Sequence, residues 1–457
     1  MLKNKTLNQT KTPIADFVKR YQESKITRFH MPGHKGKTFL GCEGYDITEV
    51  KGADSLYEAE GIIAKSERFA TELFGSGATF YSTEGSSQCI RAMLYLAIVR
   101  YQKKNKKERP VILAARNVHK AFIYAASLLD FDVIWLWPEG GSGSLCSCVV
   151  SEDTLKAALD TYGDRTAGVY ITSPDYLGGI ADVSMFARIC HAYETILLVD
   201  NAHGAYLHYL EEPCHPMDLG ADLCCDSAHK TFPVLTGGAY LHLNASVTKE
   251  MEAQAKHALC LFGSTSPSYL ILSSLDLCNE YLGDGYKQKL SVCAGKLNEI
   301  RRKLRLHGWY VEETDPLRIT LRMPNGLSGT DCAEKLRFHG MECEYADEDY
   351  LVLMLTPENE EDSLEKLVDV LGENALEYGR KEPLPMVKTT QVLSIREAMF
   401  SSAETVSVED AKGRICRTPT VSCPPAIPIA VPGEMIEENA LYLFSFYGIE
   451  SIDVVID

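Results

Sequence analysis

The chain has 457 residues, which is long enough for two or three domains with sizeable cores. Its hydrophobic fraction of 45% and its charged fraction of 24% are ordinary for a globular protein. The formal net charge of −17 argues against nucleic acid or an anionic membrane surface as a partner.

The cysteines and the first residues bear on the compartment. The fifteen cysteines are scattered, include the adjacent pair Cys224-Cys225, and form no CxxC pair or zinc-type Cys/His spacing. We therefore expect reduced thiols and no metal site. Residues 1–11 are polar and contain no signal-peptide core, and no apolar run approaches the roughly 20 residues that span a bilayer. These features predict a cytoplasmic protein that has no membrane partner.

The first half of the chain predicts an arm followed by a large α/β domain. Residues 1–60 are mixed, with a turn-rich stretch at 29–36, and we expect an arm or loop region there. Residues 61–245 alternate short apolar runs with helical segments such as Ser87–Arg100, the pattern of a mostly parallel sheet. The seven expected strands are Ala78–Ser82, Val111–Ala114, Val133–Leu136, Gly168–Thr172, Ile196–Val199, Asp222–Cys225 and Gly238–Leu243.

The second half predicts two further regions. Residues 246–380 read as a smaller α/β domain, and residues 381–457 as a C-terminal domain that opens with a helix at Thr390–Ser401. In the smaller domain we expect helices at Tyr269–Leu282 and Gln288–Leu304 and strands at Leu317–Met323 and Leu351–Thr356.

Lys230 and Asp200 are the strongest candidates for chemistry. Each follows an apolar run, so each is expected at the carboxyl end of a strand, where open α/β sheets bind ligands. A lysine that forms a Schiff base and an aspartate that keeps a ring nitrogen protonated are what pyridoxal phosphate requires of a protein. Alone, the lysine could be a solvated surface charge and the aspartate a turn cap.

Two other segments fit the same cofactor. The stretch 82–88 joins a strand to a helix, and Gly85, Ser86 and Ser87 there offer backbone amides and hydroxyls to a phosphate. Ser227 could add a further hydroxyl. His119 follows another strand and could stack on the cofactor ring opposite Ala202, although a packing histidine is common at such a position.

The order of these motifs resembles a known family, the ornithine/lysine/arginine decarboxylases of the aspartate aminotransferase fold (fold type I), in the shorter group without an N-terminal wing domain. Ser227-Ala228-His229-Lys230-Thr231 is similar to the Ser-x-His-Lys signature of that family. Other matches are Phe29–Gly36, Asp46–Glu49, Glu60–Ile63, Leu261–Tyr269, Pro424–Pro428 and Val431–Glu434.

The resemblance implies a role for each matching residue. Lys230 would form the Schiff base, Asp200 would pair with the ring nitrogen, and His229 would lie near the substrate carboxylate or Cα. The implied cofactor-binding set is Gly85, Ser86, Ser87, His119, Asp200, Ala202, His203, Ser227, His229, Lys230 and Ser266. Glu434 would bind the far end of a basic substrate, and the segment 264–268 would reach the site of a neighbouring subunit in a homodimer or larger homo-oligomer.

Four positions depart from the family pattern, namely Glu84, Ser55, Cys423 and Ala426. These departures leave the cofactor set intact and bear on the substrate and the level of activity. The substrate stays open among arginine, lysine and ornithine, which differ in length and head-group shape, because one carbon is worth only about 1–3 kcal/mol in a pocket. The expected activity is decarboxylation in polyamine-type metabolism. The alternatives are another pyridoxal phosphate reaction, such as transamination, aldol cleavage or elimination, and a weakly active regulatory paralogue. A binding module without cofactor would leave the polar strand ends unexplained.

Overall fold

The computed structural model describes residues 11–104, 108–138, 144–373, 384, 389–419 and 427–456. The chain divides into two compact units. Unit 1 comprises residues 1–104 and 196–289, and unit 2 comprises residues 105–195 and 290–457.

The principal sheet has seven strands in the order β1-β7-β6-β5-β4-β2-β3. The strands are β1 (Ala78–Ser82), β2 (Val111–Ala115), β3 (Asp132–Leu136), β4 (Thr166–Thr172), β5 (Leu197–Asp200), β6 (Leu223–Asp226) and β7 (Ala239–Leu243). β2 pairs in parallel with β3 and β4, and β5 with β6, whereas β7 is antiparallel to β1 and β6. All seven expected strands are confirmed, each within one or two residues at its ends.

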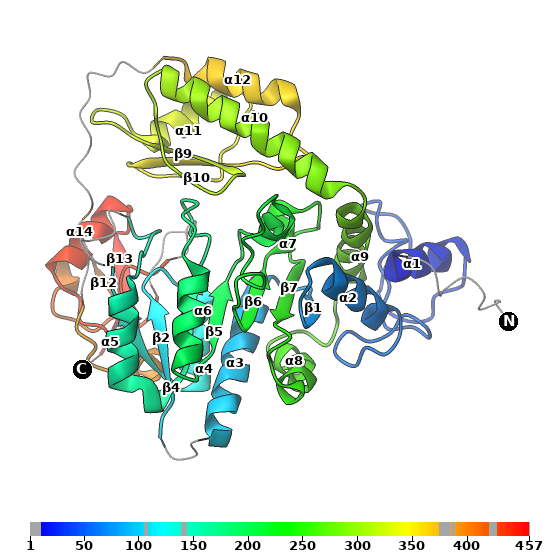
Figure 1. Ribbon diagram of the computed structural model, residues 1–457, viewed down its shortest axis with the longest axis horizontal. Helices are drawn as coiled ribbons and strands as arrows, with labels where there is room; N and C mark the ends of the chain where they lie inside the picture. The colour runs from blue at the N-terminus through cyan, green and yellow to red at the C-terminus, as the bar shows by residue number, and fades with distance from the viewer. Residues whose placement is uncertain are drawn as a thin grey trace. The chain divides into compact units, whose positions relative to one another are not determined.

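Unit 1 contains β1, β5, β6 and β7. Its helices are α1 (Pro13–Glu23), α2 (Ile62–Leu73), α3 (Ser86–Lys104), α7 (Ala228–Thr231), α8 (Lys249–Leu261) and α9 (Tyr269–Gly283), with the 3-10 helix η2 (Ala205–Tyr209). Helix α3 packs on β5, β6 and β7 and on α8, while α1, α2 and α9 pack together (Figure 1). The strands of this unit are buried almost throughout, as their apolar sequences predict.

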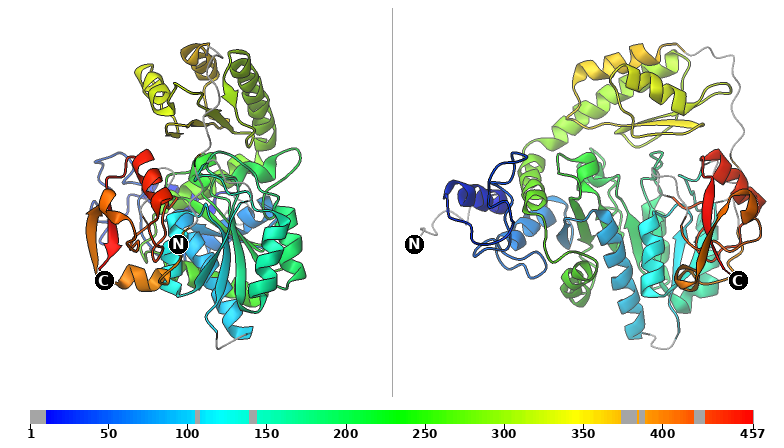
Figure 2. Two further views of the ribbon diagram at one scale, coloured as in Figure 1. Left: turned by 90° about the vertical axis from the view of Figure 1, so that its left-hand side faces the viewer. Right: turned by 180° about the vertical axis from the view of Figure 1, so that it is seen from behind.

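Unit 2 contains β2, β3 and β4 and two smaller sheets. The four-stranded sheet has the order β10-β11-β9-β8, and β12 and β13 form an antiparallel pair. These strands are β8 (Tyr310–Val311), β9 (Arg318–Arg322), β10 (Tyr345–Ala346), β11 (Tyr350–Met354), β12 (Ala403–Ser407) and β13 (Ser451–Val455). The views of Figure 2 show α11 and α12 on one face of the four-stranded sheet, as in a two-layer α/β structure.

The remaining helices belong wholly or mainly to unit 2. They are α4 (Lys120–Leu129), α5 (Glu152–Tyr162), η1 (Gly163–Arg165), α6 (Val183–Ala192), α10 (Tyr286–Leu306), α11 (Gly329–Phe338), α12 (Glu361–Leu371), α13 (Ile395–Phe400), η3 (Glu409–Ala411) and α14 (Glu438–Phe446). No helix of the described ranges combines the length and the apolar character that crossing a membrane requires.

Two expectations about helices need correction. The helix expected at Thr390–Ser401 is only α13, because Ser394 and Glu397 form a capping box that fixes its start at residue 395. The N-terminal segment is not loop alone, since α1 lies within it. Asp276 of α9 accepts hydrogen bonds from the backbone N–H groups of Ile14 and Ala15, at 2.8 and 2.9 Å, and so holds the start of α1.

Candidate active site

Lys230 lies on the one-turn helix α7, directly beyond the carboxyl end of β6. Its Nζ lies 2.8 Å from Nε2 of His203, in the loop that follows β5. The side chain is half-buried, and the backbone N–H of Lys230 donates to the carbonyl of Ser227 at 3.0 Å. The predicted Schiff-base lysine is therefore held in place and hydrogen-bonded to an imidazole.

His229, the neighbour of Lys230, has a defined tautomer. Its Nδ1–H donates to the carbonyl of Gly238 at 2.9 Å, which leaves Nε2 as the acceptor. Burial lowers the pKa of His229 and Lys230 lowers it further, although the bond to Gly238 opposes this. The ring is consequently a neutral base at neutral pH.

Asp200 is the last residue of β5 and is almost fully buried. Its Oδ1 accepts from the backbone N–H of Ala202 at 3.2 Å and lies 3.6 Å from the thiol of Cys225 on β6. Burial raises the pKa of Cys225 well above its usual range, so the sulfur is a thiol and a donor. Ala202 is itself buried, as expected of a residue near a ring face.

The expected phosphate cradle lies at the start of α3. Gly85 has a φ of +72°, in the left-handed region, and no heavy atom within 4 Å would meet a Cβ placed there. Its N–H donates to the carbonyl of Gly237 at 2.7 Å, which fixes the turn. Ser86 and Ser87 then open the helix, and the hydroxyl of Ser227 donates to that of Ser86 at 2.8 Å. Two hydroxyls and a helix N-terminus thus meet at one point, the arrangement that binds a phosphate.

Glu84, which directly precedes this cradle, contacts the loop before α9. Its exposed side chain accepts a hydrogen bond from the backbone N–H of Ser264, so it stabilises the loop before α9. Ser266 lies exposed in that loop, where its N–H donates to the hydroxyl of Ser264 at 3.1 Å. A cofactor role for Ser266 in a neighbouring subunit stays a prediction.

His119 and Glu434 belong to unit 2. Nδ1 of His119 accepts from the backbone N–H of Ala121 at 3.1 Å, so the ring caps α4, and stacking on a cofactor stays a prediction. Glu434 is buried, and its Oε2 lies 3.3 Å from a guanidinium nitrogen of Arg116 and accepts from Val431 N–H at 2.7 Å. The described contacts of Glu434 are structural, and a substrate-binding role also stays a prediction.

Arg116 explains why Glu434 lies there. Its guanidinium donates to the carbonyls of Pro428 and Ile429 at 3.0 and 3.1 Å and packs over the ring of Trp135. The arginine thus fastens the C-terminal segment to the end of β2. Of the four departures, Ser55 is half-buried in unit 1, while Cys423 and Ala426 lie outside the described residues.

Sequence reasoning missed a group of polar residues beneath this site. Asp226, His215 and His242 are fully buried in unit 1 and hydrogen-bonded to one another. The signal was a histidine within the otherwise apolar strand of residues 239–243 and an aspartate directly before Ser227.

The residues of unit 1 fit pyridoxal phosphate. The amine of Lys230 can reach the aldehyde, the Asp200 carboxylate suits a protonated ring nitrogen, and the paired serine hydroxyls suit the phosphate. The open space beside Gly85 leaves room for the phosphate oxygens.

Comparison with known proteins identifies the family. Residues 12–323 match the major domain of the Orn/Lys/Arg decarboxylases, and residues 377–449 match their C-terminal domain. The chain belongs to this family. Its members are pyridoxal phosphate-dependent decarboxylases, which confirms the expected enzyme class and cofactor.

Relatives and solved structures agree with this assignment. The arginine decarboxylase of Bacillus subtilis is 28% identical over 96% of this chain and 94% of its own length, and that of Halalkalibacterium halodurans is 27% identical over 95% and 92%. The lysine decarboxylase LdcF of Francisella novicida superposes with a TM-score of 0.80 at 17% identity, covering 97% of this chain and 81% of LdcF. That likeness confirms the fold type I architecture.

Proposed function

We propose that this enzyme removes the α-carboxylate of a basic amino acid, with arginine as the preferred substrate. The observation that carries the proposal is the contact between Lys230 and His203, beside Asp200 at the carboxyl ends of β5 and β6. We propose arginine rather than lysine or ornithine because several relatives that align over almost the whole chain are named arginine decarboxylases.

Each residue of unit 1 has a part in the mechanism. Bound pyridoxal phosphate supplies an electron sink that stabilises the carbanion left at Cα when carbon dioxide departs. Lys230 would hold the cofactor through its amine, and His203 is placed to accept the proton that this amine must lose to act as a nucleophile. Asp200 keeps the ring nitrogen protonated, which the low dielectric of its buried site favours.

The remaining residues orient the substrate and move the last proton. Ser86, Ser87 and Ser227 would hold the phosphate, and Ala202 of unit 1 would pack against the ring. Selectivity for decarboxylation would require the site to orient the substrate with its Cα–carboxylate bond perpendicular to the plane of the cofactor ring. His229 or Lys230 returns a proton to Cα, and the neutral His229 can relay that proton through Nε2.

We further propose a homodimer or larger homo-oligomer in the cytoplasm that supplies amines to polyamine metabolism, with the four-part domain division given above. The fourteen cysteines in the described segments are free thiols, which supports a reducing compartment. Several large apolar side chains of the N-terminal segment are exposed, among them Phe29, Phe39 and Leu40, which supports a subunit interface there.

The first test is to replace the lysine. In Lys230→Ala, we expect the visible absorbance of the bound cofactor to disappear and kcat to fall by about 10³-fold or more, because both cofactor attachment and proton transfer are lost. The purified enzyme is incubated with arginine, lysine, ornithine and uncharged norleucine, and amine and carbon dioxide are measured. Lys103→Ala is the matched control, since this exposed lysine of the same unit pairs only with Glu250 in the described contacts.

The outcomes separate the alternatives. Agmatine and carbon dioxide from arginine support the proposal, and an amine from lysine or ornithine alone corrects the substrate. Cofactor absorbance without any amine product favours another pyridoxal phosphate reaction. A protein that binds no cofactor is the regulatory paralogue.

A further inference from the structure

A buried carboxylate lies directly behind the predicted cofactor site. Oδ2 of Asp226 accepts hydrogen bonds from Nε2 of His215 and from Nε2 of His242, both at 3.0 Å. Its Oδ1 accepts from Nδ2 of Asn201 at 2.7 Å and lies 3.6 Å from the thiol of Cys224. We call these five residues the Asp226 centre.

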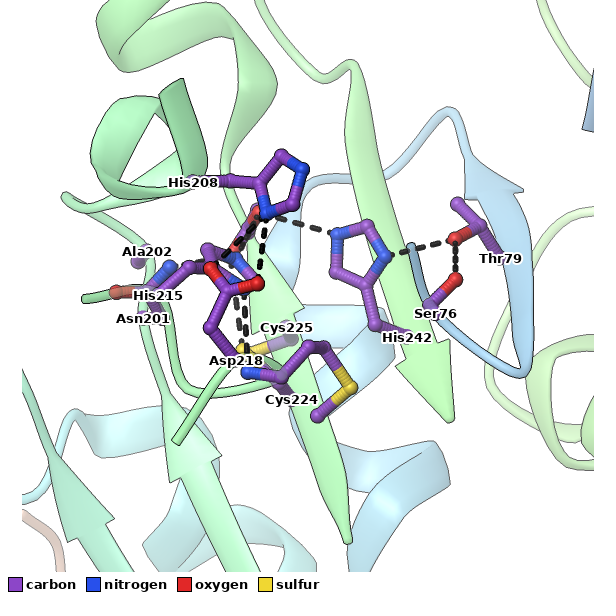
Figure 3. Close-up of polar contacts among 12 residues, drawn as sticks. Ser76, Thr79, Asn201, Ala202, His208, His215, Asp218, Cys224, Cys225 and His242 are labelled. Carbon is purple, nitrogen blue, oxygen red and sulfur yellow. Dashed lines mark hydrogen bonds and ion pairs between the residues drawn. The ribbon is translucent and has the colours of Figure 1, made fainter. Parts of the chain in front are cut away.

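The hydrogen bonds at the edge of the centre fix where its protons lie. The backbone N–H of Met217 donates to Nδ1 of His215 at 3.2 Å, so Nε2 of that neutral ring must carry the proton. Nδ1 of His242 lies 2.8 Å from the hydroxyl of Thr79, which lies 2.7 Å from that of Ser76 (Figure 3). When the hydroxyl of Ser76 donates to that of Thr79, and the hydroxyl of Thr79 donates to Nδ1 of His242, Nε2 of His242 carries the proton that it donates to Asp226.

The centre is therefore an ionised carboxylate surrounded by donors. Burial by itself would raise the pKa of Asp226, but His215 and His242 outweigh it and hold that pKa far below its usual range. Burial also lowers the pKa of His242, while the Asp226 carboxylate opposes that shift. The buried carboxylate is tolerated here because up to four donors converge on it.

The same geometry argues against a metal ion. Nε2 of His215, which faces Asp226, carries a proton, so it offers no lone pair to a cation. Burial raises the pKa of Cys224 well above its usual range, and a neutral thiol is a poor metal ligand.

The link to the catalytic residues runs through Asn201, which lies between Asp200 and Ala202. Its side chain binds Asp226, and its backbone N–H donates to the carbonyl of Cys225 at 3.0 Å. The thiol of Cys225 in turn reaches Asp200. These contacts join the end of β5 to the end of β6, where Ser227 directly follows Asp226.

We propose that Asp226 is a positioning residue for cofactor binding. Held by His215 and His242, it fixes Asn201 and thereby the separation between Asp200 on β5 and Ser227 and Lys230 beyond β6. This inference rests on the proposed function. It holds that the Asp226 centre sets the distance between the residue that binds the ring nitrogen and the residues that bind the phosphate.

The test compares two variants that each remove one hydrogen bond from opposite ends of the centre. Asn201→Ala removes the side-chain hydrogen bond that joins Asp226 to the end of β5. Thr79→Val removes the hydrogen bond to His242 on the other side and leaves Asn201 unchanged. Apoenzyme of each is titrated with pyridoxal phosphate, following visible absorbance and tryptophan fluorescence, and thermal unfolding of each apoenzyme is measured. Asp226→Asn is added, with Asp276→Asn as the same substitution at another buried carboxylate of unit 1.

We expect Asn201→Ala and Asp226→Asn to weaken pyridoxal phosphate binding about tenfold and to shift the visible band, because a bond to a charged group is lost. Thr79→Val and Asp276→Asn should stay within about twofold of the wild type, which sets the size of an effect due to stability alone. If Asn201→Ala binds the cofactor no more weakly than Thr79→Val, the proposal is wrong, even where Asp226→Asn does not fold.

Three further results bear on the inference. Wild-type protein that binds pyridoxal phosphate while all variants bind equally well overturns the inference and leaves the proposed function intact. Wild-type protein that binds no cofactor overturns both. One equivalent of zinc in the purified protein, lost in Asp226→Asn, would replace the positioning role with a metal site.

Discussion

Among the described residues of unit 1, Asp226 and Asp276 are fully buried carboxylates whose pKa values are shifted in opposite directions. Asp226 faces two imidazoles and an amide, and its pKa is held far below the usual range. Asp276 accepts from two backbone N–H groups and from the hydroxyl of Ser66 at 2.5 Å, but burial dominates and raises its pKa to about 7. Burial alone therefore does not set the charge of a buried acid.

The difference lies in the donors. The hydroxyl of Ser66, unlike the proton-bearing imidazole nitrogens around Asp226, can also accept a hydrogen bond, so it tolerates a protonated Asp276. The Asp226 centre is thus a charged clamp, whereas Asp276 is a cap on α1 whose charge changes with pH.

The largest expected effect is the loss of the clamp. Asp226→Ala leaves the N–H groups of His215 and His242 buried without an acceptor, and we expect it to lower the free energy of unfolding by about 3–5 kcal/mol. Urea denaturation of the apoenzyme at pH 7.5 measures this. A loss below about 1 kcal/mol would mean that the two histidines find other hydrogen-bond acceptors and that Asp226 contributes little to stability.

The next prediction separates the two carboxylates by pH. The pKa of Asp276 is higher in the folded protein than its ordinary value of 3.8, so the folded state retains a proton that the unfolded state has lost between pH 4 and pH 7. Stability contributed by this group is complete below about pH 4 and falls as pH rises to about 7. Asp276→Asn resembles the protonated acid at every pH. Relative to that of the wild type, its free energy of unfolding should therefore rise by about 2 kcal/mol as the pH increases from 5 to 8.

Urea midpoints at pH 5, 6, 7 and 8 check this prediction. Glu72→Gln, which removes an exposed carboxylate of the same unit, is the control and should follow the wild-type curve. A constant difference between Asp276→Asn and the wild type across this range would show that Asp276 is ionised throughout, as Asp226 is.

The sequence predicted the fold well because its signals are local. Short apolar runs separated by helical segments gave all seven strands of the principal sheet, since buried parallel strands are apolar on both faces. The start of α13 and the presence of α1 were missed. A capping box decides the first, and a side chain about 260 residues away, Asp276, supports the second.

The candidate site was predicted as a set of residues but not as a network. Lys230, Asp200 and Ser227 were predicted because each lies at or just beyond the carboxyl end of a strand, and the family signature implied their roles. The contact of Lys230 with His203 and the clamp on Asn201 depend on which strands are neighbours, and neither is written in local spacing. Glu434 shows a different case, because the motif predicts substrate binding and the described contacts of its carboxylate are with Arg116 and Val431, so that role stays a prediction.

The smallest expected effect comes from the edge of the clamp. Thr79→Val keeps the shape of the side chain but removes the hydroxyl that faces Nδ1 of His242, and we expect a loss of about 1 kcal/mol. Because burial favours the neutral form of His242 and the pKa of Asp226 lies far below its usual range, we expect the loss to be equal at pH 6 and pH 8. Urea midpoints at both values measure it. If the loss at pH 6 differs from that at pH 8, His242 titrates in the folded protein, and the clamp is then an ion pair whose charge, like that of Asp276, depends on pH.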